Sequence, residues 1–260
     1  MGRRTAAAVL CGMSLLLGGC GSHDSSPTSS ATTVTAAPEP SPTPAANEYV
    51  DAVVHTRGLG TARTEIILTS TIGDQSRDLT AEGGLDLARG YGDLTWRSAD
   101  GSVVHERSNS KGLFVQSDGP TGPWEKRDGV DASSTGPVSD VLRGLGTLSS
   151  LQLAGTEVFQ GITFHRYTGV VPVSAQSLGQ LGIGSEDAAA IAASAPDAMV
   201  QVTVWIDPSG RVVRVDRAIE VSDTSVGPVG ATTTTRLTEF SGDLDLSPPP
   251  SESVVTAAAS

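Results

Sequence analysis

Cysteine is scarce in this chain, which has only Cys11 and Cys20 among its 260 residues. Cys11 lies in an N-terminal apolar segment that we expect to be removed, so the remaining chain would keep one cysteine. A single cysteine forms neither an internal disulfide nor a cysteine metal site. The folded chain must therefore be held together by its apolar core and its hydrogen bonds.

Basic and aromatic side chains are also few. The 17 Lys and Arg face 29 Asp and Glu, which gives a net charge of -12. The charge becomes about -14 once the basic N-terminal segment is removed. Such an acidic chain is a poor candidate for binding nucleic acid or anionic lipid surfaces. Only 4% of the residues are aromatic, whereas glycine occurs 30 times. Together with abundant Thr, Ser and Val, this composition favours strands and turns over a helical bundle.

The first nineteen residues have the pattern of a bacterial export signal. Arg3 and Arg4 carry their only charges, and an apolar or small-residue run follows from Ala6 to Leu17. This run is too short to be a permanent membrane-spanning helix. The sequence LGGC, ending at Cys20, resembles the lipobox, in which the cysteine accepts diacylglycerol and becomes the new N-terminus. We therefore expect a lipoprotein signal peptide and lipid attachment at Cys20; the alternative is an ordinary secretory signal with an incidental cysteine.

The predicted domain boundaries follow from composition. The signal peptide covers 1–19. Residues 20–46 are rich in Ser, Thr and Pro and cannot bury enough apolar surface to fold, so they are predicted to be a disordered tether. Its reach would be roughly 30 Å if flexible and about 80 Å if extended by proline. A folded domain at 47–246 and a disordered tail at 247–260 complete the chain. Two acyl chains anchor a protein stably, so the expected location is the extracytoplasmic face of the cell membrane.

Apolar spacing within the folded domain predicts mainly strands. A strand is expected at 64–73, a meander of short strands at 77–129, and two strands around the Gln160-Gly161 turn. The clearest element is a hairpin at 199–221, in which alternating valines and isoleucines mark one face. Its register stays open, because the facing valines favour a two-residue loop and Gly210 favours a turn with a bulge.

A Thr-rich last strand and two or three helices complete the predicted fold. Tyr49, Val50, Val53 and Val54 share one face of a short first helix, and Val138, Val141, Leu142 and Leu145 share a face of a second one. A third helical segment at 174–196 is interrupted by glycine and has a start signal at Ser185-Glu186-Asp187. Strands and helices do not alternate regularly, so the expected class is α+β with an antiparallel sheet and not a doubly wound parallel sheet.

The order of these elements resembles the LppX/LprAFG family of actinobacterial, mycobacterial-type lipoproteins. The resemblance extends over about 47–246 and is carried by the lipobox, the proline-rich tether, the meander, GPWEK at 122–126 and VTVWIDPSGRVVRVD at 202–216. It implies a LolA/LolB-like fold, in which a curved antiparallel half-barrel has helices packed on its concave face around an apolar cavity. It further implies a membrane-anchored protein that binds an acylated lipid or glycolipid there and helps its transport through the cell envelope.

The apolar faces of two segments predict the lining of this cavity. A carrier must shelter acyl chains, because each exposed methylene costs about 0.8 kcal/mol. Gly179, Gly182 and Gly184 would let the interrupted helical segment move as a lid. The alternative is that the same side chains simply fill a core. The predicted lining residues are Leu178, Leu181, Ile183, Ile191, Val202, Val204, Val213 and Val215.

Residues typical of catalysis and metal binding are not grouped in the sequence. His55, His105 and His165 occur singly, without ligand spacing. GIGSEDA lacks the second glycine of a nucleophile elbow and is better explained as a helix start. We therefore expect no catalytic residues, no metal, no cofactor and no nucleic-acid partner. The alternatives are an envelope sensor with the same fold and an unknown protein partner, an envelope hydrolase, and a structural lipoprotein with a filled core.

Overall fold

The computed structural model describes residues 48–117, 119, 121–127, 141, 142, 145, 148 and 151–256. These residues all belong to one compact unit, Pro44–Ser260. The predicted signal peptide, Cys20 and the tether lie outside the described residues, as does most of the helix predicted around 137–151. Five positions of that segment are described, and four of them, Val141, Leu142, Leu145 and Leu151, are buried in the core.

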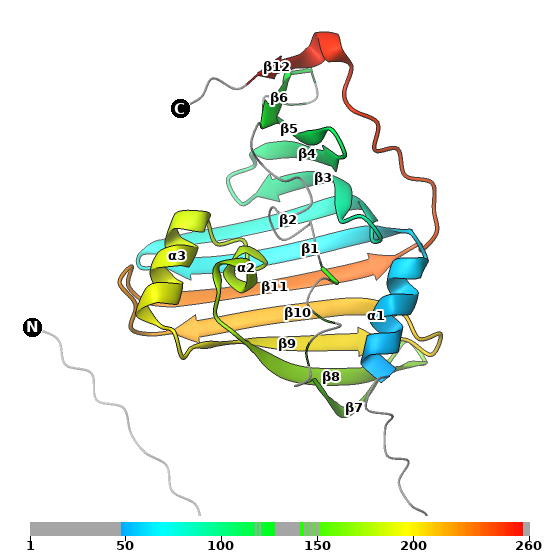
Figure 1. Ribbon diagram of the computed structural model, residues 1–260, viewed down its shortest axis with the longest axis vertical. Coiled ribbons are helices and arrows are strands. Elements are labelled where there is room, and N and C mark those ends of the chain that lie inside the picture. Colours follow the sequence, from blue (N-terminus) through cyan, green and yellow to red (C-terminus); the bar gives the residue numbers. More distant parts are fainter. Residues whose placement is uncertain are drawn as a thin grey trace, which may run out of the picture. The chain divides into compact units, whose positions relative to one another are not determined.

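One curved sheet dominates the described part of the chain (Figure 1). Its twelve strands lie in the order β12-β6-β5-β4-β3-β2-β1-β11-β10-β9-β8-β7, and all pairs are antiparallel except β12–β6. The strands are β1 Thr61–Ile72, β2 Gln75–Asp86, β3 Tyr91–Ser98, β4 Val103–Asn109, β5 Gly112–Gln116, β6 Trp124–Arg127, β7 Gln152–Phe159, β8 Ile162–Pro172, β9 Met199–Ile206, β10 Val212–Val221, β11 Val229–Thr238 and β12 Val254–Thr256.

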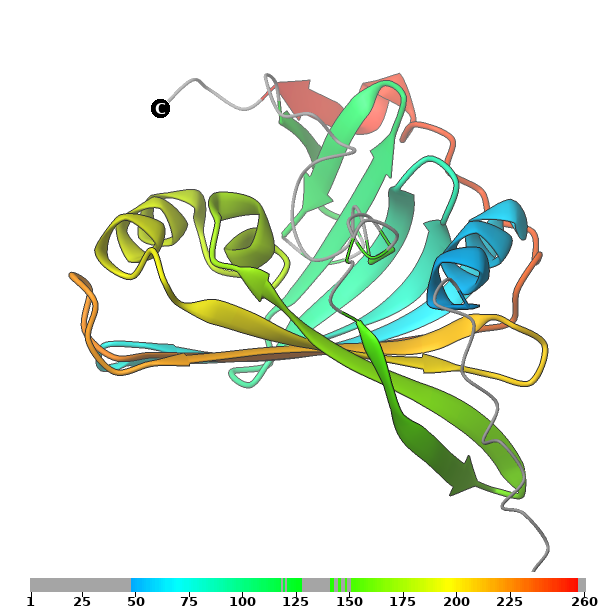
Figure 2. The same cartoon turned by 60° about the horizontal axis from the view of Figure 1, so that its bottom comes forward.

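Three helices pack on one face of this sheet. They are α1 Glu48–Gly58, α2 Ala175–Gly179 and α3 Ser185–Ser194. Figure 2 shows them on the same side, with β3 to β6 curling up toward that side, so this face is the concave one. The predicted class, an α+β fold with helices on the concave face of a curved antiparallel sheet, is confirmed.

Helix α1 docks by a face slightly different from the one predicted. Tyr49, Ala52 and Val53 are buried, whereas Val54 is 64% exposed. The buried face is completed by Thr56, whose hydroxyl donates to Ala52 O at 2.6 Å and accepts from the backbone N–H of Val212 at 2.8 Å. Ala52 and Thr56 are not large apolar residues, so a search for large apolar side chains at helical spacing does not identify them as part of the buried face.

The β9–β10 hairpin adopts the bulged alternative. Gly210 has a φ of +73°, which glycine adopts without steric cost, and the register shifts between Val212 and Arg214. Val215 is buried on the concave face, while Val213 is the extra residue of the bulge.

The disordered tail predicted from residue 247 is wrong for residues 247–256. This segment contains a 3-10 turn at Ser251–Ser253 and strand β12, which pairs in parallel with β6. Before the 3-10 turn, the backbone carbonyl of Ser247 accepts from Arg107 Nη1 at 3.1 Å, and that of Leu246 accepts from Asn109 Nδ2 at 2.9 Å. We call residues 243–250 the strap. Its contacts with β4 are made by backbone carbonyl groups, which every residue has, so the sequence of the strap shows no pattern that predicts them.

Candidate functional site

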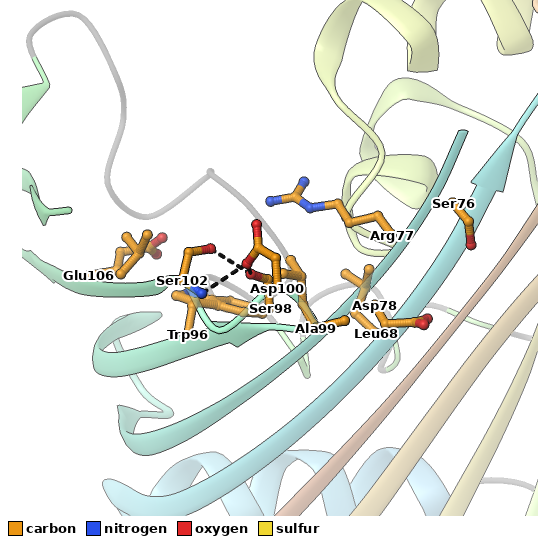
Figure 3. A pocket seen from close by; sticks show the side chains of 13 residues that line it. Leu68, Ser76, Arg77, Asp78, Trp96, Ser98, Ala99, Asp100, Ser102 and Glu106 are labelled. Carbon is orange, nitrogen blue, oxygen red and sulfur yellow. Dashed lines mark hydrogen bonds between the residues drawn. The ribbon is translucent and has the colours of Figure 1, made fainter. Parts of the chain in front are cut away.

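A pocket of about 570 Å³ lies on the concave face, between β1–β4 and the connection from α2 to α3 (Figure 3). This volume is within the range of roughly 300–1,000 Å³ that is usual for small-molecule sites. Its lining residues are Leu68, Ser76, Arg77, Asp78, Leu79, Trp96, Ser98, Ala99, Asp100, Ser102, Val104, Glu106 and Gly182.

The floor of the pocket is apolar. Leu68 on β1 and Trp96 on β3 are buried, and Leu79 on β2 and Val104 on β4 pack against the same core. Trp96 stands directly opposite Val104 in the β3–β4 ladder. Side chains two residues apart on a strand share a face, so four neighbouring strands together supply this surface.

The rim of the pocket is polar and includes the β3–β4 turn. The hydroxyl of Ser98 donates to the Asp100 carboxylate, and the backbone N–H of Ser102 donates to the same carboxylate at 2.8 Å. These hydrogen bonds, that from Ser98 foremost, lower the pKa of Asp100 to about 2. The Arg77 guanidinium extends over the pocket from β2, so the rim presents charges of both signs (Figure 3).

Glu106 is an acidic group in a mainly apolar setting. It faces Leu94 across β3 and Val115 across β5. Burial raises the pKa of Glu106 to about 7, and the adjacent Trp96 indole N–H opposes the rise only in part. The side chain can therefore be a neutral hydrogen-bond donor below pH 7 and an anion above it.

The α2–α3 connection closes onto the floor at Gly182. Its φ is +72°, and a Cβ at this position would lie 2.0 Å from Leu68 Cδ1. By contrast, a Cβ at Gly179 or Gly184 would meet no atom within 4 Å. Gly182 is thus required for close contact between the connection and the sheet.

The predicted lining residues are distributed over different places. Val202 lines a smaller concave-face pocket of about 350 Å³ near α2, and Val213 lines a separate groove with Trp205 and Arg214. None of the eight lines the 570 Å³ pocket. The remaining six residues are buried in the core: Leu178, Leu181, Ile183, Ile191, Val204 and Val215. That any of the eight contacts a ligand stays a prediction.

The histidines occupy separate environments. His165 Nδ1 lies 2.7 Å from Glu48 Oε1, and His105 stacks on Trp124 with ring centroids 5.9 Å apart. No cluster of three or more His, Cys, Asp or Glu suited to a metal ion occurs among the described residues. Within the same part of the chain, no helix has the length and apolar character needed to cross a membrane.

Comparison with known proteins identifies similar solved structures, although no protein-family model and no curated protein matches the chain. The lipoprotein LppX from Mycobacterium tuberculosis is 18% identical, with a TM-score of 0.48 over 78% of this chain and 97% of that one. LprF from Mycobacterium bovis is 15% identical, with a TM-score of 0.45 over 78% and 96%. A putative outer membrane lipoprotein-sorting protein domain from Vibrio parahaemolyticus is 10% identical, with a TM-score of 0.25 over 77% and 95%. The family that the sequence resembles thus occurs among the solved structures similar to this chain.

Proposed function

We propose that this protein binds an acylated lipid or glycolipid on its concave face and helps to move it through the cell envelope, while Cys20 anchors the chain to the membrane. The observation that carries this proposal is the 570 Å³ pocket, with its apolar floor beneath a polar rim. This arrangement suits an amphipathic ligand, whose acyl chain needs shelter from water and whose headgroup needs hydrogen-bonding partners.

The rim offers specific chemistry to a headgroup. Arg77 can pair with a phosphate or carboxylate, and the hydroxyls of Ser98 and Ser102 can bind sugar or glycerol oxygens. Neutral Glu106 can donate to an ester carbonyl close to the apolar floor. The pocket thus supplies polar groups at the depth where a lipid changes from acyl chain to headgroup.

A second feature supports a cavity that can enlarge. The 570 Å³ pocket reaches Gly182 on one side of the α2–α3 segment, and the 350 Å³ pocket reaches Ser177 and Gln180 on the other. Helix α2 has only five residues, so its displacement would break few helical hydrogen bonds, although it would also expose Leu178 and Leu181, which are fully buried. Displacement of this segment would join the two pockets into one cavity for longer acyl chains.

Native mass spectrometry tests the proposal. A soluble form that begins at Asn47 is produced in an actinobacterial host, and bound material is extracted into organic solvent. We expect an added mass of one lipid class at about one molecule per protein. Val104→Phe, which fills the pocket floor, should abolish the added mass. Val103→Phe on the opposite face of β4 is the matched control and should retain it.

The opposite result has a clear meaning. A clean polypeptide mass, with no uptake of added diacylated lipid, would contradict the carrier function. A sensor that binds an envelope protein would then be the better explanation.

A further inference from the structure

The tip of the β7–β8 hairpin is unusually apolar for a projecting surface. We define the tip as Val158 to Ile162. Val158 is 67% exposed, Phe159 63% and Ile162 48%. A two-residue turn joins the strands, with φ of +51° at Gln160 and +78° at Gly161. Figure 2 shows this hairpin extending away from the face that the helices cover.

A groove of about 810 Å³ lies behind the tip and has a mixed lining. Four aromatic side chains contribute to it, Phe159, Phe164, Trp205 and Phe240, together with charged ones, and the Arg214 guanidinium lies over the Trp205 ring. Trp205 alternates with the buried Val204 and Ile206 on β9, so it faces the outer side of the sheet. The tip is therefore the exposed apolar cluster of this region, and clustered apolar surface marks an interaction site more often than scattered exposed residues do.

The tip itself can leave water without carrying a charge into an apolar medium. Its five residues carry no charge. On one flank, Glu157 accepts a hydrogen bond from Trp205 Nε1 at 2.9 Å. On the other flank, His165 pairs with Glu48 at 2.7 Å. Burial of the tip would therefore add apolar transfer energy with little desolvation cost.

The arginines around the groove are also neutralised. Arg211 pairs with Asp207 at 2.5 Å, Arg214 pairs with Asp216 at 2.6 Å, and Arg236 pairs with Glu65 at 2.7 Å. The net charge of -12, which becomes about -14 once the basic N-terminal segment is removed, opposes binding of the domain to anionic lipid. Any contact with a bilayer must therefore rely on apolar insertion.

The chain enters the folded domain beside this tip. Glu48, the first residue of α1, accepts hydrogen bonds from His165 and from the Tyr167 hydroxyl on β8. His165 follows Ile162 by three residues, which is about 10 Å along a strand. The segment that leads to Cys20 is therefore joined to the end of the domain that carries the tip.

We propose that the tip inserts into the surface of the lipid bilayer and docks the domain on the membrane to which Cys20 tethers it. The proposal rests on the membrane anchorage in the proposed function and is independent of the pocket. In the sheet, β9, β10 and β11 separate the hairpin from the strands that line the pocket. Insertion at one site and cargo binding at the other can therefore be measured separately.

The test uses residues 20–260 with Cys20→Ser, so that no acyl chain anchors the protein, and phosphatidylcholine vesicles in a sedimentation assay. Phe159→Thr should weaken partitioning about tenfold, which corresponds to about 1.4 kcal/mol. Val158→Thr should weaken it severalfold. Val54→Thr is the matched control, because Val54 is 64% exposed but lies on α1, and it should change partitioning less than twofold. Salt and added phosphatidylglycerol should not strengthen binding.

A fluorescence readout gives the position of the tip. Phe159→Trp preserves an aromatic side chain and should show a blue shift with vesicles, together with quenching by brominated lipid; Val54→Trp should show neither. Failure of the unmodified tip to bind vesicles, or equal binding by the Phe159 and Val54 variants, would overturn the proposal. Native mass measurements on the same proteins report cargo separately, so retained lipid with no vesicle binding would contradict docking and leave the carrier function intact.

Discussion

Replacement of Glu106 by glutamine should stabilise the protein above neutral pH and leave its stability almost unchanged near pH 4. In the folded protein, burial raises the pKa of Glu106 from 4.5 to about 7. Between these two values the unfolded chain loses this proton before the folded chain does. Ionisation of Glu106 therefore lowers the free energy of unfolding as the pH rises from about 4.5 to about 7, and the loss is complete above that range.

The size of the effect follows from the shift in pKa. Each pKa unit corresponds to about 1.4 kcal/mol, so the full shift amounts to roughly 3 kcal/mol as an upper value. Glutamine has the shape of the protonated acid and no charge to desolvate. In a domain of this size, 3 kcal/mol corresponds to about 6–12 °C in Tm.

Urea denaturation at pH 4, 6 and 8 measures this difference directly. The Glu106→Gln curve should separate from the wild-type curve progressively as the pH rises. Glu82→Gln, at an exposed position of β2, removes the same charge and should change stability by less than about 0.5 kcal/mol at every pH. A Glu106→Gln protein that is no more stable than wild type at pH 8 would refute the reasoning, since the carboxylate would then be well solvated in the folded state.

Two glycine substitutions test the packing at the pocket, and two truncations test the C-terminal segment. Gly182→Ala should cost about 1–3 kcal/mol in thermal unfolding, because its Cβ collides with Leu68 and its φ is positive. Gly179→Ala should be neutral or slightly stabilising, and equal effects of the two would contradict the close contact. Truncation after Gly242 removes the strap and β12 and should cost about 2–4 kcal/mol. Truncation after Thr256 keeps these elements and should have no effect; a stable protein without the strap would show that its hydrogen bonds are replaced by water.

The strands were predictable from sequence where one face is buried and the other is solvated. The hairpin at 199–221 shows this best, because burial of Val200, Val202, Val204 and Ile206 leaves a clean alternation. The bulge at this hairpin could not be predicted with the same certainty, because Gly210 favoured a bulged turn whereas the facing valines favoured a two-residue loop. Tertiary packing decided between them.

The pocket could not be predicted, because it is assembled from residues that are distant in sequence. Trp96 and Glu106 belong to different strands, and only their register brings both to the concave face. On β4 the pocket contains Val104 and Glu106, and only the first of these is apolar. A carboxylate among apolar positions gives no signal of burial in the sequence.

The position of β11 has a consequence for how the protein reaches its folded state. In the described sheet, β1 to β6 form one run of sequential neighbours and β7 to β10 form another. Strand β11 joins the two runs by pairing with both β1 and β10. The hydroxyl of Thr64 donates to the carbonyl of Arg236, 172 residues away. A contact of such high sequence separation forms slowly, and until it forms each half has an open edge. The N-terminal half of the chain is synthesised first. The free edge of β1 therefore stays uncovered until almost the entire polypeptide, including β11, is available.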